Sequence, residues 1–256
     1  MVSEFIRKAE LCKQSIDQLR PLEGKMLKQV TDFYRVATTW SSNAIEGNSL
    51  SISETKVLIE DGLTASGKPL RDILEASGHA KAYDYMFSLL KCAKITEQDI
   101  LTIHRLLYCG IDLDAAGVYR TEPVMVTGSS YPVSAPEKVE NDMKNLMTWA
   151  ARERKKYHPI VFAAELHRRF VFIHPFLDGN GRTARLIMNA ALIQSGYLPC
   201  VISPYIRADY ISALELSHKD PSRFQAFIAE TELETEKDFM RNLDIKLPNL
   251  KGFIEP

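Results

Sequence analysis

The chain has 256 residues, a formal net charge of −1, and 45% hydrophobic and 25% charged residues. These values are typical of a globular protein with one sizeable core, and they argue against a general nucleic-acid-binding surface. Charges run through the first twenty residues and apolar runs stay shorter than about 18 residues, so we expect neither a signal peptide nor a membrane span. With its four scattered cysteines, the chain is predicted to be a cytoplasmic protein with reduced thiols.

The N-terminal part of the chain has the apolar spacing of amphipathic helices. Residues 3–35 show this spacing, with interruptions at Pro21 and Gly24. No linker long enough to separate two domains follows them. We therefore predict that residues 1–60 are N-terminal helices that pack on a larger unit, residues 61–256, so that the whole chain is one globular body.

Helical spacing continues through most of the remaining chain. Ser51 followed by Glu54 is a capping-box pattern, and Thr96 is a second candidate N-cap. Glu75 and His79 lie one turn apart and are predicted to form a pair on a helix surface. The segments with helical spacing are 53–62, 71–92, 97–108, 136–153, 159–173, 181–195, 207–218 and 221–242.

One interval has a different pattern. Residues 117–135 alternate apolar and polar positions and contain β-branched residues on both sides of a Gly-Ser-Ser turn, which predicts a short β-hairpin. The predicted fold is therefore mainly α: a helical bundle that carries one short β-hairpin.

Residues 172–185, FIHPFLDGNGRTAR, form a polar, glycine-rich stretch between two apolar segments. Counted from Asp178 as a calcium loop, the fifth position is Arg182 and the twelfth is Asn189, where calcium requires oxygen ligands. No lysine follows Gly181, so the stretch is not a Walker A loop. Zinc would need more histidines or cysteines than this stretch provides.

The same residues fit an anion site at the start of a helix. Gly179 and Gly181 permit backbone conformations that turn successive N–H groups inward, and a helix beginning near Asn180 adds its positive dipole end. Arg182 and Arg185 are three residues apart and can form a clamp for a polyphosphate. The alternative is that the glycines only turn a corner between two core helices, with the arginines in salt bridges.

Two further residues of this stretch can carry chemistry. Asp178 supplies a hard oxygen ligand of the kind that Mg²⁺ shares with phosphates. His174, at the end of the preceding helix, can accept a proton from an attacking hydroxyl.

Residues 174–185, HPFLDGNGRTAR, resemble the signature of the Fic (filamentation induced by cAMP) domain, HxFx(D/E)GNGRxxR, and match it at every defined position. The resemblance covers roughly residues 35–235. It implies a helical protein adenylyltransferase, an enzyme that moves AMP from ATP to a Ser, Thr or Tyr hydroxyl of a target protein.

The resemblance also implies a role for each residue of the signature. His174 would be the general base and Asp178 the Mg²⁺ ligand. The backbone of residues 179–181 together with Arg182 would hold the α- and β-phosphates, and Arg185 would reach the γ-phosphate.

A second motif lies in residues 39–50, TWSSNAIEGNSL. Taken alone, Glu46 would be an ordinary helical glutamate before Gly47 as a C-cap. Beside the first motif, Ser42-x-x-x-Glu46-Gly47 resembles the family's inhibitory motif, (S/T)xxxE(G/N), which implies that Glu46 pairs with Arg185 and occupies the γ-phosphate site. The same carboxylate could instead position a water for removing AMP from a modified target, and the sequence does not decide between these two roles.

The hairpin and a later helix complete the predicted site. As a flap, residues 124–133 would hold a target segment by β-augmentation; the alternative is an ordinary surface hairpin. By resemblance, Tyr210 would stack on the nucleobase and His218 would contact it, although relatives often carry Asn at that place and core packing is an alternative for both. The flap residues expected near the nucleotide are Val126, Thr127, Gly128 and Ser129.

The predicted partners are ATP with Mg²⁺ and a target protein, without nucleic acid or membrane, and a homodimer through the N-terminal or flanking helices is compatible with the sequence. Two alternative functions stay open. One is a hydrolase that removes AMP by using Glu46. The other is a nucleotide-sensing interaction module, which would be expected to have a damaged base or loop, and neither is damaged here.

Overall fold

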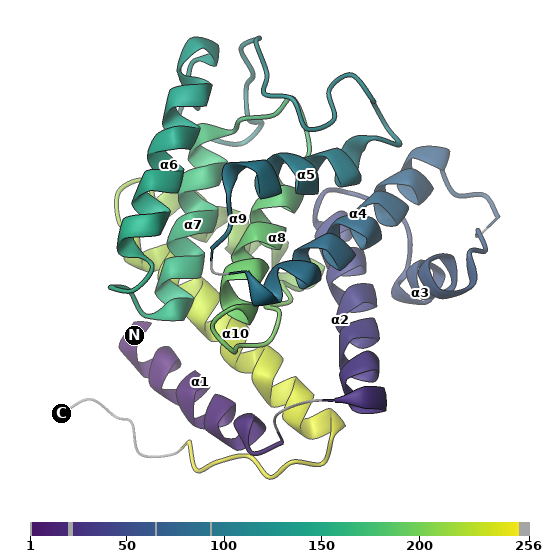
Figure 1. Ribbon diagram of the computed structural model, residues 1–256, viewed down its shortest axis with the longest axis vertical. Helices are drawn as coiled ribbons and strands as arrows, with labels where there is room; N and C mark the ends of the chain where they lie inside the picture. The colour runs from purple at the N-terminus through teal and green to yellow at the C-terminus, as the bar shows by residue number, and fades with distance from the viewer. Residues whose placement is uncertain (1, 20–22, 65, 93, 251–256) are drawn as a thin grey trace.

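The computed structural model describes residues 2–19, 23–64, 66–92 and 94–250, and within these residues it contains helices and no β-strand (Figure 1). The predicted interruption at Pro21 lies outside the described residues, whereas Gly24 is the first residue of a helix. The α-helices are α1 (Val2–Asp17), α2 (Gly24–Ile45), α3 (Ile52–Asp61), α4 (Leu70–Ser88), α5 (Glu97–Tyr108), α6 (Val139–Glu153), α7 (Pro159–Ile173), α8 (Asn180–Ile193), α9 (Arg207–Leu216) and α10 (Ser222–Asn242). The short 3₁₀ helices are η1 (Leu89–Lys91), η2 (Pro136–Lys138) and η3 (Pro204–Ile206).

The predicted helix starts at Ser51 and Thr96 are confirmed. Ser51 caps α3 in a capping box with Glu54, and Thr96 caps α5 in a capping box with Asp99. In each box, the backbone N–H of the cap residue and that of the residue three positions later each donate to the other residue's side chain, which stabilises the first turn of the helix. Local sequence therefore sets where these two helices begin.

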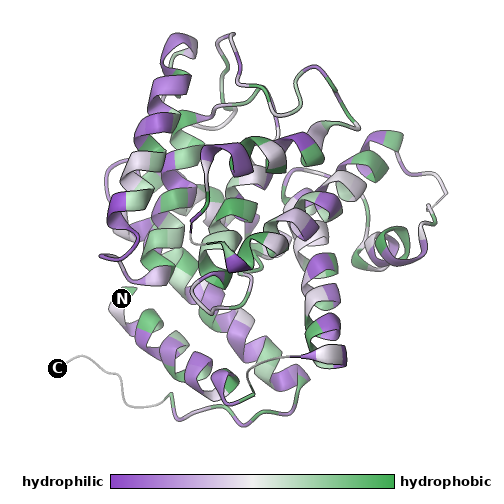
Figure 2. Ribbon diagram, in the orientation of Figure 1, coloured by the Kyte–Doolittle hydropathy of each residue, from purple (hydrophilic) through white to green (hydrophobic). Residues whose placement is uncertain are grey.

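Helices α7 and α8 form the centre of the bundle and pack along each other. Twelve of the fourteen residues of α8 are buried, as expected for a helix that is covered on all sides. Figure 2 shows apolar residues concentrated where these two helices meet. Helix α1 packs along α10, although the two come from opposite ends of the chain (Figure 1).

The predicted β-hairpin over residues 117–135 is not present. The turn itself forms, because the N–H of Ser129 donates to the carbonyl of Val126 at 3.1 Å, but the arms on each side do not pair. Pro123 and Pro132 flank this turn and have no N–H to donate to a ladder. The mainly α fold class is thus confirmed, and the hairpin is replaced by an irregular segment.

The predicted surface pair on α4 is wrong, because Glu75 and His79 are 8% and 1% exposed. Helix α4 packs against both α2 and α5, and this side of it is covered. His79 Nδ1 lies 3.0 Å from the hydroxyl of Thr39, and Glu75 forms an ion pair with Arg182. Burial with the nearby arginines lowers the pKa of His79 to about 3, so this imidazole is neutral.

The boundary predicted after residue 60 falls in the last turn of α3, and the division remains a prediction. Side chains of α1 and α2, including Ala9, Cys12, Tyr34 and Ile45, belong to the main core. Among the described helices, none is both long and apolar enough to cross a lipid bilayer.

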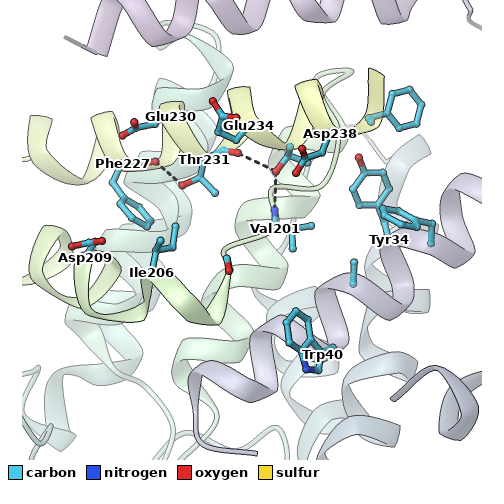
Figure 3. Close-up of a pocket in the computed structure, with 15 residues that line it drawn as sticks. Tyr34, Trp40, Val201, Ile206, Asp209, Phe227, Glu230, Thr231, Glu234 and Asp238 are labelled. Carbon is cyan, nitrogen blue, oxygen red and sulfur yellow. Dashed lines mark hydrogen bonds between the residues drawn. The ribbon is translucent and has the colours of Figure 1, made fainter. Parts of the chain in front are cut away.

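A groove of about 540 Å³ lies between α2, η3 and α10, and no residue of the signature segment (residues 174–185) lines it (Figure 3). Its floor is partly aromatic, with Trp40 and Phe227, and carboxylates such as Glu230 lie along α10. The hydroxyl of Thr231 donates to the Phe227 carbonyl at 2.8 Å within α10. The groove is therefore formed jointly by α2, η3 and α10, and it does not include the signature segment.

Candidate functional site

The signature segment joins α7 to α8 through a tight, internally bonded loop. His174 ends α7 in the left-handed conformation with φ 53°, and Gly179 precedes α8 with φ 76°. The Asn180 side chain accepts from the N–H of Phe176 at 2.9 Å and donates to its carbonyl at 2.8 Å. These bonds fix the loop from within, so that its functional side chains start from a defined backbone.

His104 of α5 packs against the same loop. Its ring stacks on Phe176 with centroids 3.6 Å apart, its Nε2 donates to the Asp178 carbonyl at 3.0 Å, and its Nδ1 accepts from the N–H of Gly117 at 2.8 Å. Burial lowers the pKa of His104 to about 4, and the neutral imidazole has the one donor and one acceptor that these bonds need. No sequence pattern predicts this contact, because it joins residues 74 positions apart.

His174, the predicted base, is partly buried at the mouth of the loop. Its carbonyl accepts from Arg120 Nε at 2.7 Å, and the carbonyl of Pro175 accepts from the Arg120 N–H at 2.9 Å. Burial lowers the pKa of His174, which favours the neutral form that accepts a proton. Arg120 was not identified from the sequence, because its partners are far from it along the chain.

Asp178, the predicted metal ligand, has a side chain that is 44% exposed. Its carboxylate accepts from the N–H of Gly179 at 2.6 Å, from Arg71 Nη2 at 2.9 Å and from the hydroxyl of Tyr108 at 3.3 Å. Burial raises the pKa of Asp178, but the charge of Arg182 and these hydrogen bonds outweigh it, and the net pKa is lowered. Asp178 is therefore an ionised carboxylate at the mouth of the site, and its oxygens can bind a metal ion.

In the described part of the chain, no three His, Cys, Asp or Glu side chains gather as a metal site made by protein alone. A single open carboxylate nevertheless fits Mg²⁺, which commonly takes one or two protein carboxylates and completes its octahedron with phosphate and water oxygens. Asp178 is the residue that would hold such an ion.

The two arginines predicted to form a clamp contact different acceptors. Arg182 is 2% exposed, and its guanidinium lies 3.2 Å from Glu75 and 3.5 Å from the Asn43 side chain. Arg185 is 5% exposed and donates to the Ser42 hydroxyl and carbonyl, both at 2.9 Å. In this structure each arginine is therefore held by its own set of acceptors.

Glu46 extends from the C-terminal end of α2 onto the start of α8. Its Oε1 lies 2.7 Å from Arg185 Nη2, and its side chain is 39% exposed. Burial raises the pKa of Glu46, but Arg185 more than offsets this and the carboxylate is held ionised. A Cβ on Gly181 would lie 2.5 Å from this same oxygen, so glycine at that position leaves the room that Glu46 occupies. Gly47, with φ 97°, turns the chain away after it.

Tyr210 does not offer a free ring face to a nucleobase. It is 2% exposed and packs on Phe224 and Phe227 in the core. Its hydroxyl lies 2.9 Å from His167 Nε2 and 3.4 Å from Arg185 Nη1. The geometry favours the core alternative, with the hydroxyl in contact with Arg185.

The flap (residues 124–133) and α9 close around a cavity of about 90 Å³, and that volume holds only about three water molecules. His218 lines it, with its ring stacked between Tyr131 and Phe172 at centroid distances of 3.9 and 3.6 Å. Glu215, which sequence reasoning missed, accepts from the Ser129 hydroxyl at 2.9 Å. The predicted flap residues Val126, Thr127, Gly128 and Ser129 all line this cavity.

Comparison with known proteins identifies the central part of the chain. Residues 94–192 match the model of the Fic/DOC family. Protein adenylyltransferase Fic of Nematostella vectensis is 39% identical over 194 residues, which are 74% of this chain and 45% of that protein. Protein adenylyltransferase fic-1 of Caenorhabditis elegans is 35% identical over 196 residues, 73% of this chain and 37% of the relative. The chain thus spans less than half the length of these two relatives.

Solved structures agree over nearly the whole chain. Fic-1 from C. elegans has a TM-score of 0.85 and 29% identity, and the match covers 94% of this chain and 72% of that one. A Fic domain containing signaling protein from Bacteroides thetaiotaomicron has a TM-score of 0.85 and 25% identity, with coverage of 94% and 100%. Residues 94–192 therefore carry the Fic/DOC family domain, with the signature segment inside it, and the chain has the fold of solved Fic proteins.

Proposed function

We propose that this chain is a protein adenylyltransferase restrained by its own Glu46. The observation that carries the proposal is the 2.7 Å ion pair between Glu46 and Arg185 at the start of α8. The N–H groups of a helix start and a buried guanidinium form a site for phosphate groups, and a carboxylate there acts as a substitute anion. The names of the relatives support the same reaction class.

The reaction assigned to the site is transfer of AMP from ATP to a hydroxyl. The hydroxyl oxygen of a Ser, Thr or Tyr in the target forms a bond to the α-phosphorus, and the bond from the α-phosphorus to the α,β-bridging oxygen breaks, so that pyrophosphate leaves. His174 takes the hydroxyl proton, which its lowered pKa permits at neutral pH. In this proposal, Arg182 and the N–H groups of residues 179–181 hold the phosphates after Arg182 leaves Glu75 and the Gly179 N–H leaves the Asp178 carboxylate. Mg²⁺, when bound at Asp178, would neutralise phosphate charge.

The restraint follows from charge and space. With Glu46 on Arg185, the guanidinium that would bind a γ-phosphate is already paired, and a second anion would lie beside a carboxylate. The lowered pKa of Glu46 keeps this pair intact throughout neutral and mildly acidic pH, so acidification above pH 4.5 does not release it. Release must come from movement of Glu46 itself.

The test is label transfer from α-³²P-ATP with Mg²⁺ to the protein itself or to lysate proteins. Glu46→Gly should raise labelling by about 10–100-fold, because a charge-assisted hydrogen bond of about 1.5–3 kcal/mol is removed. Adding His174→Ala to Glu46→Gly should lower it again by about 10²–10⁴-fold.

Two control variants separate the carboxylate from general loosening. Glu60→Gly removes a carboxylate near the end of α3, away from the site, and should leave labelling at the wild-type level. Glu46→Gln keeps the side-chain shape and should fall between wild type and Glu46→Gly. Equal labelling by wild type and Glu46→Gly would remove the inhibitory assignment.

The reverse reaction is the second candidate. The Glu46 side chain is 39% exposed, so water can reach the carboxylate that would position it for removing AMP. A target labelled beforehand distinguishes the two, because wild type would release the label and Glu46→Ala would not. A nucleotide-sensing module without transfer predicts binding of ATP and no label in either direction.

The target is proposed to lie along the flap, where Met125 is 97% exposed. Because the cavity behind the flap is small, admitting a nucleobase there requires Tyr131 to move away from His218. A homodimer remains a prediction.

A further inference from the structure

Two residues of α4 reach the signature segment through ion pairs. Arg71 Nη2 lies 2.9 Å from Asp178 Oδ2, and its Nε lies 3.0 Å from Glu75 Oε1. The same Glu75 oxygen is 3.2 Å from Arg182 Nη1, and Arg182 Nη2 is 3.6 Å from Asp178 Oδ1. Four charges of alternating sign therefore form a closed ring whose net charge is zero.

The ring has an outer and an inner half. The side chains of Arg71 and Asp178 are 57% and 44% exposed, whereas those of Glu75 and Arg182 are 10% and 2% exposed. An exposed ion pair is weak and can exchange partners at little cost. A buried charge that loses its partner is strongly destabilising. The Arg71–Asp178 contact is therefore the one that can open.

The buried half of the ring is hydrogen-bonded to residues that follow Glu46 in the chain. Asn48 Nδ2 donates to Glu75 Oε2 and to the carbonyl of Asp72, both at 3.0 Å. The N–H of Ser49 donates to the Asp72 carboxylate at 2.7 Å. The first turn of α4 is thus attached to the residues that directly follow Glu46 and Gly47.

We propose that Arg71 is a built-in counter-cation for Asp178. Arg71 neutralises the Asp178 carboxylate when no metal is bound. It leaves this carboxylate when a divalent cation binds, and it stays paired with Glu75. Asn48, which is bonded to Glu75, transmits the exchange to the turn after Glu46. The inference rests on the proposed function, because it takes Asp178 as the metal ligand.

Charge balance explains why the exchanging residue is Arg71. When phosphates engage Arg182, the nearly buried Glu75 loses part of its neutralisation. Arg71 already holds Glu75 through Nε, so it can neutralise this carboxylate while its Nη2 leaves Asp178. Arg71 is then the residue that lets Arg182 turn to the nucleotide.

The first test measures metal dependence without turnover. Calorimetry gives the Kd of α,β-methylene-ATP with excess Mn²⁺ and again with EDTA, and the Kd with EDTA divided by the Kd with Mn²⁺ isolates the contribution of the metal. Arg71→Met should increase this ratio by about 2–5-fold, because an exposed ion pair that competes with the metal is removed. Arg71→Lys should restore a value near wild type. Arg105→Met, an exposed α5 residue, should leave the ratio unchanged.

The second test follows the transmission to Glu46. Hydrogen exchange of residues 46–50 should rise when Mn²⁺ and the analogue are added to wild type. Asn48→Ala should keep the metal ratio and lose this response. An exchange response in Asn48→Ala equal to that of wild type would overturn the transmission.

The outcomes separate the two proposals. If wild type binds the analogue neither with nor without Mn²⁺, the proposed function fails, and the inference fails with it. If wild type binds and Arg71→Met changes the ratio by less than about twofold, which is within the range of a negligible surface pair, the inference alone fails. Because Arg71 is 57% exposed, loss of its side chain leaves the core intact, and circular dichroism checks this.

Discussion

The signature segment and the flap both leave regular secondary structure beside the same site, but they are held in different ways. The loop of the signature segment is fixed by buried partners: Asn180 from within, His104 from below and Phe176 in the core. The flap is attached through Arg120 at its base, through Glu215 at its turn and through the Tyr131–His218 stack, while Met125, next to the turn, is 97% exposed. Groups that must hold a reacting geometry are thus built on packed side chains, and the segment that must admit a partner is not.

Arg120 marks the border between the two. It is 3% exposed and donates to the carbonyls of Glu122 and Ser134 at the flap's base. It also donates to the carbonyl of His174, which ends α7. One buried guanidinium therefore sets the distance between the start of the loop and the base of the flap.

Removing the aromatic ring at the centre of the loop should have the largest effect. Phe176→Ala takes a fully buried ring from between His104, Phe170 and Tyr119 and should lower the free energy of unfolding by about 3–5 kcal/mol. Urea unfolding followed by circular dichroism measures it. A loss below about 1 kcal/mol would mean that the loop does not depend on the core, because such a value is typical of a site outside it.

Acid should lower the stability of the fold through His104, which packs against the loop. The pKa of His104 is lowered from 6.5 to about 4 in the folded chain, so between these pH values the unfolded chain binds a proton that the folded one does not. The contribution of His104 to the free energy of unfolding is therefore fully present above pH 6.5. It falls by about 3 kcal/mol as the pH is lowered to 4.

The measurement is urea unfolding at a series of pH values for wild type and His104→Asn. The variant should be less stable at pH 7 but should lose less stability between pH 6.5 and 4, because it lacks this proton uptake. Parallel pH dependences in the two proteins would show that His104 is not the source. His79 contributes to the background slope in both proteins, since its pKa is also lowered, to about 3.

How much of this contrast could be predicted from the sequence depends on the range of each interaction. The capping boxes at Ser51 and Thr96 are local, and the patterns around them placed both helix starts correctly. The spacing of Arg182 and Arg185 on a helix was also readable, but their direction was not, since it is set by Glu75 and Glu46 from other helices. Alternation alone could not reveal that the flap lacks strands.

The residues that sequence reasoning missed share one property: their partners are distant in the chain. Arg71 and Asp178 are 107 positions apart, Glu215 and Ser129 are 86 apart, and no motif marks either pair. The sequence predicts that Gly181 provides backbone freedom, whereas the structure shows that it provides space for a carboxylate oxygen of Glu46. Such contacts become visible only when the helices are packed.

The smallest effects belong to the flap, and they test whether its base and tip are independent. Arg120→Met removes a buried guanidinium that is shared by flap and loop carbonyls. It should lower the free energy of unfolding by about 2 kcal/mol, and amide exchange should rise more in residues 121–135 than in residues 176–180.

Met125→Ser, at the exposed residue next to the turn, should change the free energy of unfolding by less than about 0.5 kcal/mol and still reduce labelling of the target. Unfolding curves with urea and exchange followed by mass spectrometry measure both variants. If Arg120→Met raised exchange equally in loop and flap, the two would form one unit and the contrast between them would not hold; if Met125→Ser left labelling intact, the tip would not be where the target docks.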